Sequence, residues 1–443
     1  MSVSEQNRSA NMAGKIDLAF GTDGVVNINV PGTLSADVSG VINGPDNTLY
    51  VCGSAQDQRG SKFFIAALSS TGQLIIDFGN NGFVVGLFGE EGQSSYCTQL
   101  FLSGEKLLLV GASDIGKDPF PALARLDLQG VFDPTFGEDG RGRIIFHLPG
   151  PNGLAEQKKT IAQAANSPLR KGNTHEGSAT VLQNGKILLS HYFFRPNEPS
   201  YGLILRTLEN GTLDTDFCQT GYLPVIAPGY DNGQTQIQSV TVDSVGRYVA
   251  CGGVYDLGTS PVSTFFARYS DEGTPDTSFG PQGFRIMHDP EVIPGGSRAI
   301  TLIGLDSQGF LSCGSSVHDP YVGQLRMLKN NGEPDNDFNF GEPLNTKLVE
   351  SSTLWKAITR QSDGNFIVVG AIDKRKDTFK FDLVVARFDK TGKLDADFND
   401  GLGWARTRLS TGSDAGFVVI LQNEKIVVGG VSHNNGIVAR YHC

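Results

Sequence analysis

The chain contains little cysteine. It has six cysteines in 443 residues and no Cys-x-x-Cys pair. A disulfide framework needs a higher density of cysteine, and cysteine-rich zinc sites need closely spaced pairs, so neither organises this protein. Cys52, Cys251 and Cys313 stand at one equivalent position, in "VCGS", "ACGG" and "SCGS", where other units carry Val. We interpret them as small buried apolar residues.

Positive charge is also scarce. Lys and Arg total 36 against 47 Asp and Glu, which gives a net charge of -11 and a pI of about 5.1. A protein that binds the nucleic-acid backbone or an anionic membrane surface needs a basic face. We therefore expect no nucleic-acid partner.

Long apolar runs are missing as well. No run reaches the roughly 18 residues of a transmembrane helix, and the N-terminal "MSVSEQNRSANMAG" lacks the apolar core of a signal peptide. We expect no membrane insertion and a cytoplasmic location by default, with leaderless export left open. Gly-x-Ser-x-Gly, His-Glu-x-x-His, Walker and Rossmann fingerprints are absent, so we expect no cofactor and no metal.

One short phrase occurs seven times. It begins as "IDLAFGTDG" at residues 16–24, and its Phe returns at 78, 136, 217, 279, 338 and 398. The intervals are 58 to 62 residues, except for one of 81. Each interval contains four short β-type segments separated by turn residues, which is typical of a propeller blade. The sequence predicts an all-β, seven-bladed β-propeller with four antiparallel strands per blade.

The first phrase precedes any complete unit, and the chain ends in a third strand, "GIVARYHC". We therefore expect residues 24–30 to form the outer strand of the last blade by pairing with residues 436–442. This pairing closes the ring and removes exposed sheet edges. The expected organisation is a disordered or extended tail at 1–15 and one propeller at 16–443.

An Asp three residues before the Phe and an Arg in the third strand recur together. Both are present in six units and both are lost in the first, where Ala67 and Ile75 replace them. Residues that vanish together are expected to touch, so we predict an Arg–Asp bridge inside each of the other blades. The six expected pairs are Arg440–Asp17, Arg125–Asp133, Arg206–Asp214, Arg268–Asp276, Arg326–Asp335 and Arg387–Asp395.

These units resemble the bacterial delta-60 repeat. "RLDLQGVFDPTFGEDG" with "QNGKILLS", and "ARFDKTGKLDADFNDG" with "NEKIVVGG", carry the likeness, which extends over residues 16–443 apart from one insertion. The resemblance implies a propeller fold. It implies no activity, substrate or catalytic residue.

The long interval comes from an insertion at residues 148–174, between blades two and three. Asn152 is a candidate helix N-cap, and Leu154, Ile161, Ala162 and Ala165 fall on one helical stripe, so we expect the insertion to be partly helical. Either it covers the face of the propeller as a docking element, or it is a tolerated loop.

Loops between blades and between second and third strands meet at one face of a propeller, where ligands usually bind. This analogy leads us to expect a non-enzymatic module that recognises a glycan or a protein, and that is a monomer. The alternatives are a lyase or hydrolase at the mouth of the central channel, or a scaffold. The candidate ligand-binding residues are aromatic or charged and map to this face: Tyr96, Lys158, Lys159, His175, Glu176, Tyr230, Arg298, Tyr321, Trp355 and Lys356.

Overall fold

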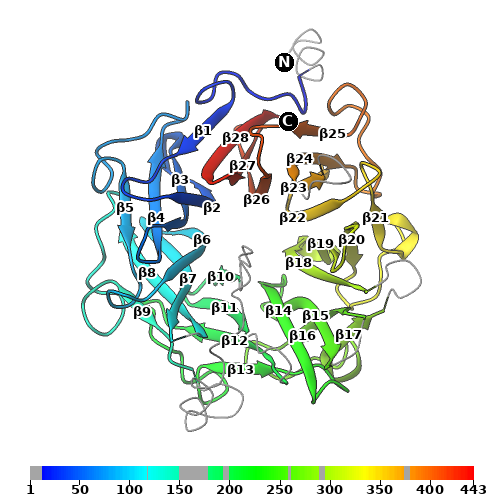
Figure 1. Cartoon of the computed structure of the whole chain (residues 1–443). Coiled ribbons are helices and arrows are strands. Elements are labelled where there is room, and N and C mark those ends of the chain that lie inside the picture. The colour runs from blue at the N-terminus through cyan, green and yellow to red at the C-terminus, as the bar shows by residue number, and fades with distance from the viewer. Residues whose placement is uncertain are drawn as a thin grey trace.

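The computed structural model describes residues 12–116, 118–148, 178–192, 199–257, 261–288, 295–373 and 380–443. Its strands form seven separate four-stranded antiparallel sheets arranged as blades around one axis (Figure 1). The prediction of a seven-bladed β-propeller is confirmed. Within the described ranges the helices are short 3-10 turns, namely η1 (Pro45–Asn47), η2 (Pro281–Gly283), η3 (Asp306–Gln308) and η4 (Asn339–Gly341).

Each blade runs from an inner strand at the axis to an outer strand at the rim. The inner strands are β2 (Ser35–Asn43), β6 (Ser95–Ser103), β10 (Ala179–Val181), β14 (Gly233–Val242), β18 (Ser297–Gly304), β22 (Thr353–Arg360) and β26 (Asp414–Gln422). The second strands are β3 (Leu49–Gln56), β7 (Lys106–Ile115), β11 (Ile187–Tyr192), β15 (Tyr248–Asp256), β19 (Phe310–Ser316), β23 (Phe366–Asp373) and β27 (Lys425–Ser432). The third strands are β4 (Ser61–Leu68), β8 (Asp118–Asp127), β12 (Gly202–Thr207), β16 (Ser263–Tyr269), β20 (Gly323–Leu328), β24 (Phe381–Phe388) and β28 (Asn435–His442). The outer strands are β5 (Phe83–Gly86), β9 (Arg143–Ile145), β13 (Tyr222–Val225), β17 (Phe284–Met287), β21 (Leu344–Thr346), β25 (Trp404–Thr407) and, for blade seven, β1 (Val25–Ile28).

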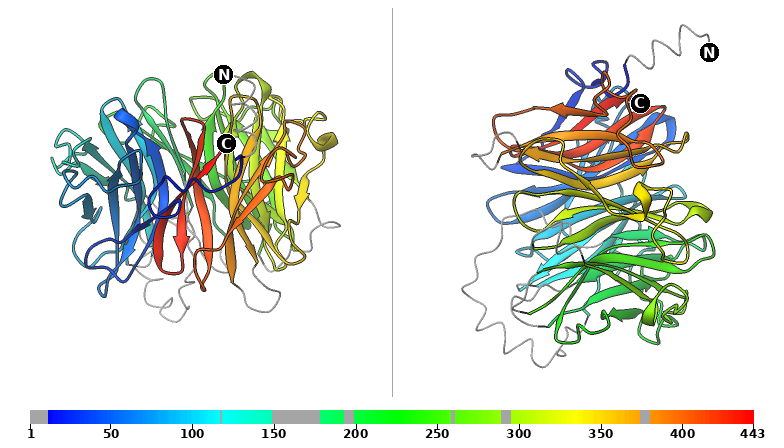
Figure 2. Two further views of the ribbon diagram at one scale, coloured as in Figure 1. Left: turned by 90° about the horizontal axis from the view of Figure 1, so that it is seen from above. Right: turned by 90° about the vertical axis from the view of Figure 1, so that its right-hand side faces the viewer.

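The two ends of the chain meet in blade seven. β1 pairs antiparallel with β28, from Val25 opposite Ala439 to Ile28 opposite Gly436. The views in Figure 2 place β1 beside the C-terminal strand. Residues 12–15, which the sequence assigned to the tail, also pack here: the Gly14 N–H donates to the His442 carbonyl at 2.9 Å. The remaining tail and the greater part of the insertion at 148–174 lie outside the described residues.

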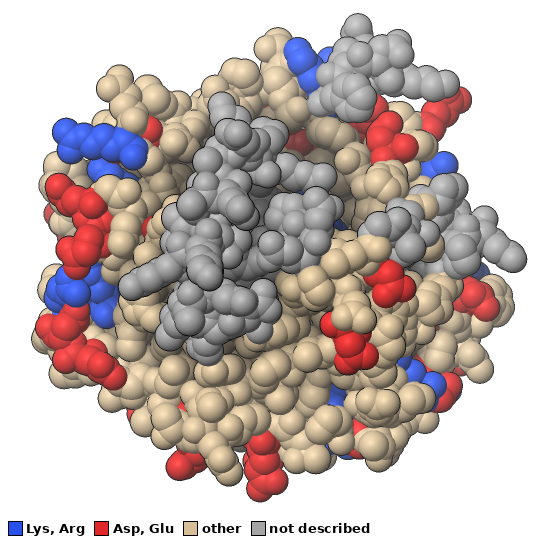
Figure 3. Space-filling model, turned by 60° about the horizontal axis from the view of Figure 1, so that its bottom comes forward, with Lys and Arg blue, Asp and Glu red and all other residues tan. Residues whose placement is uncertain are grey.

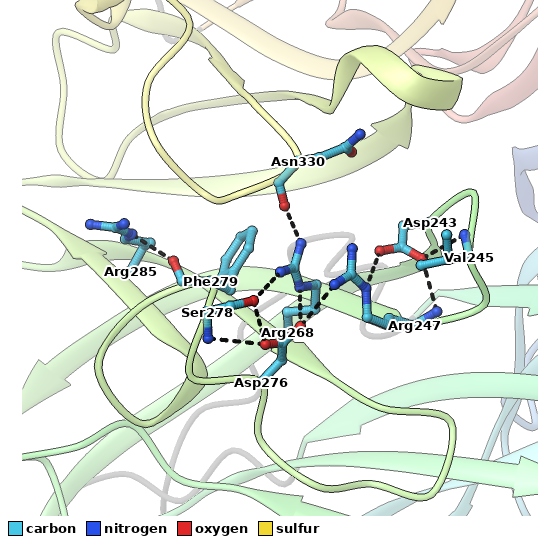
Figure 4. Close-up of polar contacts among 9 residues, drawn as sticks. All are labelled: Asp243, Val245, Arg247, Arg268, Asp276, Ser278, Phe279, Arg285 and Asn330. Carbon is cyan, nitrogen blue, oxygen red and sulfur yellow. Dashed lines mark hydrogen bonds and ion pairs between the residues drawn. The ribbon is translucent and has the colours of Figure 1, made fainter.

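Blade four shows how the repeated phrase works (Figure 4). Arg268 is nearly fully buried, and its Nε donates to Oδ2 of Asp276 at 2.9 Å. Its guanidinium carbon lies 4.7 Å from the centre of the Phe279 ring, and its Nη1 donates to the Asn330 carbonyl of blade five. One arginine therefore joins its own blade's turn, the phrase Phe and the next blade.

Five of the six predicted Arg–Asp bridges are present. The Nε–Oδ2 distances are 2.8 Å for Arg440–Asp17, 3.0 Å for Arg125–Asp133, 2.5 Å for Arg206–Asp214, 2.9 Å for Arg268–Asp276 and 2.7 Å for Arg387–Asp395.

The predicted Arg326–Asp335 bridge is wrong. Arg326 donates instead to Oε1 of Gln324 at 3.0 Å. Gln324 stands two residues before the arginine, where the other five blades have an apolar residue. Residues two apart in a strand share one face, so this amide offers Arg326 a nearer acceptor.

Blade one replaces the ion pair by apolar contact. Ala67 and Ile75 lie in the same hydrophobic cluster between blades one and two. The link to the next blade is made by the Tyr50 hydroxyl, which donates to the Leu128 carbonyl at 3.1 Å. In blade one, apolar packing and the Tyr50 hydrogen bond thus replace the contacts that Arg and Asp make in other blades.

Candidate ligand site at the inner strands

The inner strands share a local irregularity. In six of them the pairing with the second strand skips one residue, which forms a β-bulge. The bulged residues are Ser39, Thr98, Gln238, Ile300, Lys356 and Phe417. This position therefore carries a different side chain in each of these six blades, while the bulged backbone is repeated.

Blades five and six place two cations beside each other. Lys356 is the bulged residue of β22, and Arg298 lies two residues before the bulge of β18. The two strands are in contact, since the Thr301 Oγ1 donates to the Lys356 carbonyl at 2.8 Å. Burial, and then the Arg298 charge, lower the pKa of Lys356 to about 8. Both residues were predicted as site residues, and the structure brings them together.

The described residues supply no partner to either cation. Within the described part of the chain, no carboxylate or carbonyl forms an ion pair or hydrogen bond with the side chain of Arg298 or Lys356. Arg247, by contrast, contacts both Asp243 and Asp276 (Figure 4). A partly buried pair of like charges is unfavourable unless an anion neutralises it.

Polar groups also lie at the inner strands of blades three and four. The Gln236 Nε2 lies 3.2 Å from the Tyr255 hydroxyl and 3.1 Å from Gln234 Oε1. The Ser178 Oγ accepts from the Val240 N–H at 2.7 Å and links blades three and four. Gln234, Gln236 and Ser178 are buried, and these groups are already hydrogen-bonded within the protein.

Sequence reasoning missed Asp37. It occupies in β2 the position that Arg298 occupies in β18, two residues before the bulge. Burial raises the pKa of Asp37 to about 7, although the Ser54 N–H acts to lower it. An alignment of the seven units on their bulges would identify Asp37, but the position of a bulge cannot be recognised from the sequence.

The three predicted tyrosines lie at separate places. Tyr96 on β6 is 36% exposed, and its hydroxyl donates to Oδ2 of Asp114 at 2.9 Å. Burial, with the Asp114 charge, raises the pKa of Tyr96 to about 12. Tyr230 packs partly against the core between blades three and four. Tyr321 is partly buried, and its N–H donates to the Ser352 Oγ at 2.9 Å.

The prediction that Trp355 is an aromatic residue of the ligand face is wrong. Its side chain is fully buried between blades five and six and meets the Phe388 ring edge-to-face. A side chain that precedes the bulge points into the contact between blades, so Trp355 stabilises the core. The predicted residues Lys158, Lys159, His175 and Glu176 lie outside the described residues.

A hollow of about 490 Å³ lies between the loop after β5 and the outer strand β9. Phe88, Glu90, Arg141 and His147 are among its lining residues. Its charges are already compensated, because Arg141 contacts Glu90 at 2.9 Å and also pairs with Asp139. The hollow is thus a weaker candidate than the unpaired cations at the inner strands.

Figure 3 shows one face of the molecule, on which the described surface is largely uncharged and the charged side chains lie mainly toward the rim. In the ranges that the structure covers, no helix has the length and apolarity needed to span a bilayer. Over those same ranges, no three His, Cys, Asp or Glu side chains are grouped to hold a metal ion.

Residues 106–136 match a protein-family model described as "Domain of unknown function (DUF5122) beta-propeller". The matched segment contains β7, β8 and the turn up to Phe136. The match covers part of one repeat. The family is related to the delta-60 repeats, so the resemblance seen in the sequence is confirmed. The sequence matches no curated protein.

Solved structures with a similar architecture share little sequence with this chain. An extracellular domain of a hybrid two-component system from B. thetaiotaomicron is 10% identical with a TM-score of 0.45 over 94% of this chain, which spans only 40% of that one. An ulvan lyase of a new polysaccharide lyase family is 12% identical with a TM-score of 0.47, over 93% of this chain and 95% of that one. A Penicillium chrysogenum α-L-arabinanase complexed with arabinobiose is 13% identical with a TM-score of 0.40, over 95% and 98%. These likenesses concern the fold alone.

Proposed function

We propose that this protein is a non-enzymatic binding module for an acidic carbohydrate, which is held at the inner strands of blades five and six. The supporting observation is the Arg298–Lys356 pair, two adjacent cations that have no partner among the residues the structure describes. A uronate carboxylate there would accept hydrogen bonds from both side chains and neutralise their repulsion.

The overall charge favours selective recognition. A protein with a net charge of -11 repels polyanions in general, so a small basic site discriminates by geometry as well as by charge. In blade four the position equivalent to that of Arg298 carries Gln236, and an amide of this kind can bind neutral sugar hydroxyl groups. An acidic segment of a protein is the competing ligand.

Binding to a panel of immobilised polysaccharides tests the proposal. We expect retention on polygalacturonate and weak retention on the same polymer after methyl esterification, since esterification removes the negative charge and leaves the sugar hydroxyl groups in place. Retention on both polymers alike would contradict a carboxylate site. Retention on neither polymer, together with tight binding to an acidic peptide, would make the protein ligand correct.

A lyase or hydrolase is the second candidate, favoured by Asp37. A carboxyl group whose pKa lies near 7 can give or take a proton at neutral pH, and Arg298 stands at the equivalent position of another blade. Incubation with polygalacturonate distinguishes the two functions. A binder leaves the chain length unchanged, whereas an enzyme shortens it and loses this activity in the Asp37→Asn variant.

A further inference from the structure

Neighbouring blades meet at a repeated pair of positions. The first position is on the second strand of a blade and is the residue that pairs with the first inner-strand residue after the bulge. The second position is on the inner strand of the next blade and is the residue just before its bulge. Between blades six and seven these are Val369 and Gly416, and a Cβ placed on Gly416 would lie 3.4 Å from the Cβ of Val369. Between blades seven and one, a Cβ on Gly429 would lie 2.6 Å from Cγ1 of Val38. The backbones therefore approach closely at this point around the ring.

Between blades one and two both positions are cysteine. Cys52 on β3 pairs with Gly40 just after the bulge, and Cys97 on β6 stands just before the next one. Their sulfur atoms are 2.8 Å apart, and the residues are 0% and 2% exposed. Disulfide bonds join residues whose Cβ atoms lie about 3.5–4.5 Å apart, which is close to the spacing at the Val369–Gly416 position. The geometry of the fold thus matches the bond, independently of the sulfur contact.

We propose that Cys52 and Cys97 form a disulfide bond that joins blade one to blade two when the protein folds in an oxidising environment. The two thiols are oxidised to the disulfide, and a low-molecular-weight disulfide such as oxidised glutathione is reduced to two thiols. One S–S bond forms, the donor's S–S bond breaks, and the two thiol protons pass to the two donor thiols released. Because both sulfurs are buried afterwards, the bond forms during folding, while they are still accessible.

The other cysteines at this position have no cysteine opposite. Cys251 shares its cluster with Ala299, and Cys313 shares its cluster with Trp355, both of which precede the next blade's bulge. These two thiols stay reduced, so the proposal concerns one pair and not cysteine oxidation in general.

Peptide mapping tests the bond. The full chain is unfolded and refolded with a glutathione redox pair, then denatured in N-ethylmaleimide, digested and analysed by mass spectrometry. We expect a linked peptide pair containing Cys52 and Cys97, with Cys251 and Cys313 alkylated. Full alkylation of Cys52 and Cys97 in refolded protein would overturn the proposal. The same holds if Cys52 links indiscriminately to all the other cysteines.

Two variants separate the bond from general effects on folding. Cys97→Ala should remove the linked peptide, while Cys251→Ala, the matched control, should keep it. The bond closes a loop of about 45 residues, so reductant should lower the Tm of the wild-type protein and of Cys251→Ala by about 5 °C and leave Cys97→Ala unchanged. Ala299→Cys places a thiol opposite Cys251 and should create a second linkage there. If that variant folds without a new linkage, the repeated contact does not have disulfide geometry.

Discussion

The Nε of Arg440 lies 2.8 Å from Oδ2 of Asp17, which is 423 residues away in the sequence. The same arginine donates to the Ser70 carbonyl of blade one and lies 4.4 Å from the centre of the Phe20 ring. A contact that is local in blades two, three, four and six here joins the two ends of the chain. Ring closure therefore uses the same interactions as those four blades, with one partner supplied by the N-terminus.

Arg440→Ala should destabilise the protein by about 3 kcal/mol, because it leaves the buried Asp17 carboxylate without its main partner. Urea unfolding of the variant and the wild-type protein measures this difference. Arg141→Ala, which removes two exposed ion pairs, should leave the free energy of unfolding nearly unchanged.

Blade one supplies a further control for closure. The double variant Arg440→Ala with Asp17→Ile copies the Ala67–Ile75 pair that blade one uses naturally. We expect it to recover part of the lost stability, since no unpaired carboxylate remains. Equal stability of wild-type and Arg440→Ala proteins would show that the bridge does not secure closure.

Removal of residues 1–30 deletes β1 and exposes the edge of β28. Unpaired strand edges promote association, so the truncated protein should melt at a lower temperature and form oligomers. Differential scanning calorimetry with light scattering measures both effects. A truncated protein that melts like the full chain and stays monodisperse would contradict the closure.

Acid should weaken the bridges. Burial acts to raise the pKa of Asp133, but hydrogen bonds from Thr135 and the charges of Arg125 and Lys106 lower it to about 2. The folded pKa lies below the unfolded value of about 3.9, so this stabilisation is complete above pH 4 and is lost as the pH falls toward 2. The free energy of unfolding should therefore drop steeply between pH 4 and pH 2. In Asp133→Asn this slope should be smaller, and an unchanged slope would contradict the assignment.

Lys356→Gln should make the protein more stable while it removes part of the site. Burial and the Arg298 charge lower the pKa of Lys356 to about 8, so its protonated form opposes folding below pH 8 and this penalty fades as the pH rises toward 10. We expect the variant to gain roughly 1–2 kcal/mol at pH 7 and less at pH 10. Gln is the natural residue at this bulge in blade four, Gln238, so the backbone should tolerate it. The exposed Lys393→Gln is the matched control, and an equal gain there would show that the effect is general.

Most of the fold could be predicted from the sequence because the same pattern of strands and turns occurs in all seven repeats. The Phe spacing gave the blade number, and the joint loss of Arg and Asp in blade one gave the bridge, which is present in five of six expected blades. Arg326 differs because a polar neighbour, Gln324, competes for it. That competition depends on side-chain placement, which a repeat pattern does not contain.

The candidate site was less predictable. Arg298 and Lys356 were singled out from the sequence, but their adjacency depends on bulges that shift the register of β18 and β22. Because of the bulge in β22, the side chain of Trp355 points into the core. The bulge in β2 likewise puts Asp37 at the position equivalent to that of Arg298. Periodicity alone cannot assign a face to a strand that contains a bulge.

Isothermal titration of the wild-type protein and the Arg298→Gln/Lys356→Gln variant with an oligogalacturonate at pH 7 examines the proposed binding site. Both substitutions copy residues that blade four carries at the same positions, Gln236 and Gln238. We expect the wild-type protein to bind and the variant, with an unchanged or higher Tm, to bind at least about tenfold more weakly. Equal affinity of the two folded proteins would contradict the assignment of the acidic-ligand site to Arg298 and Lys356.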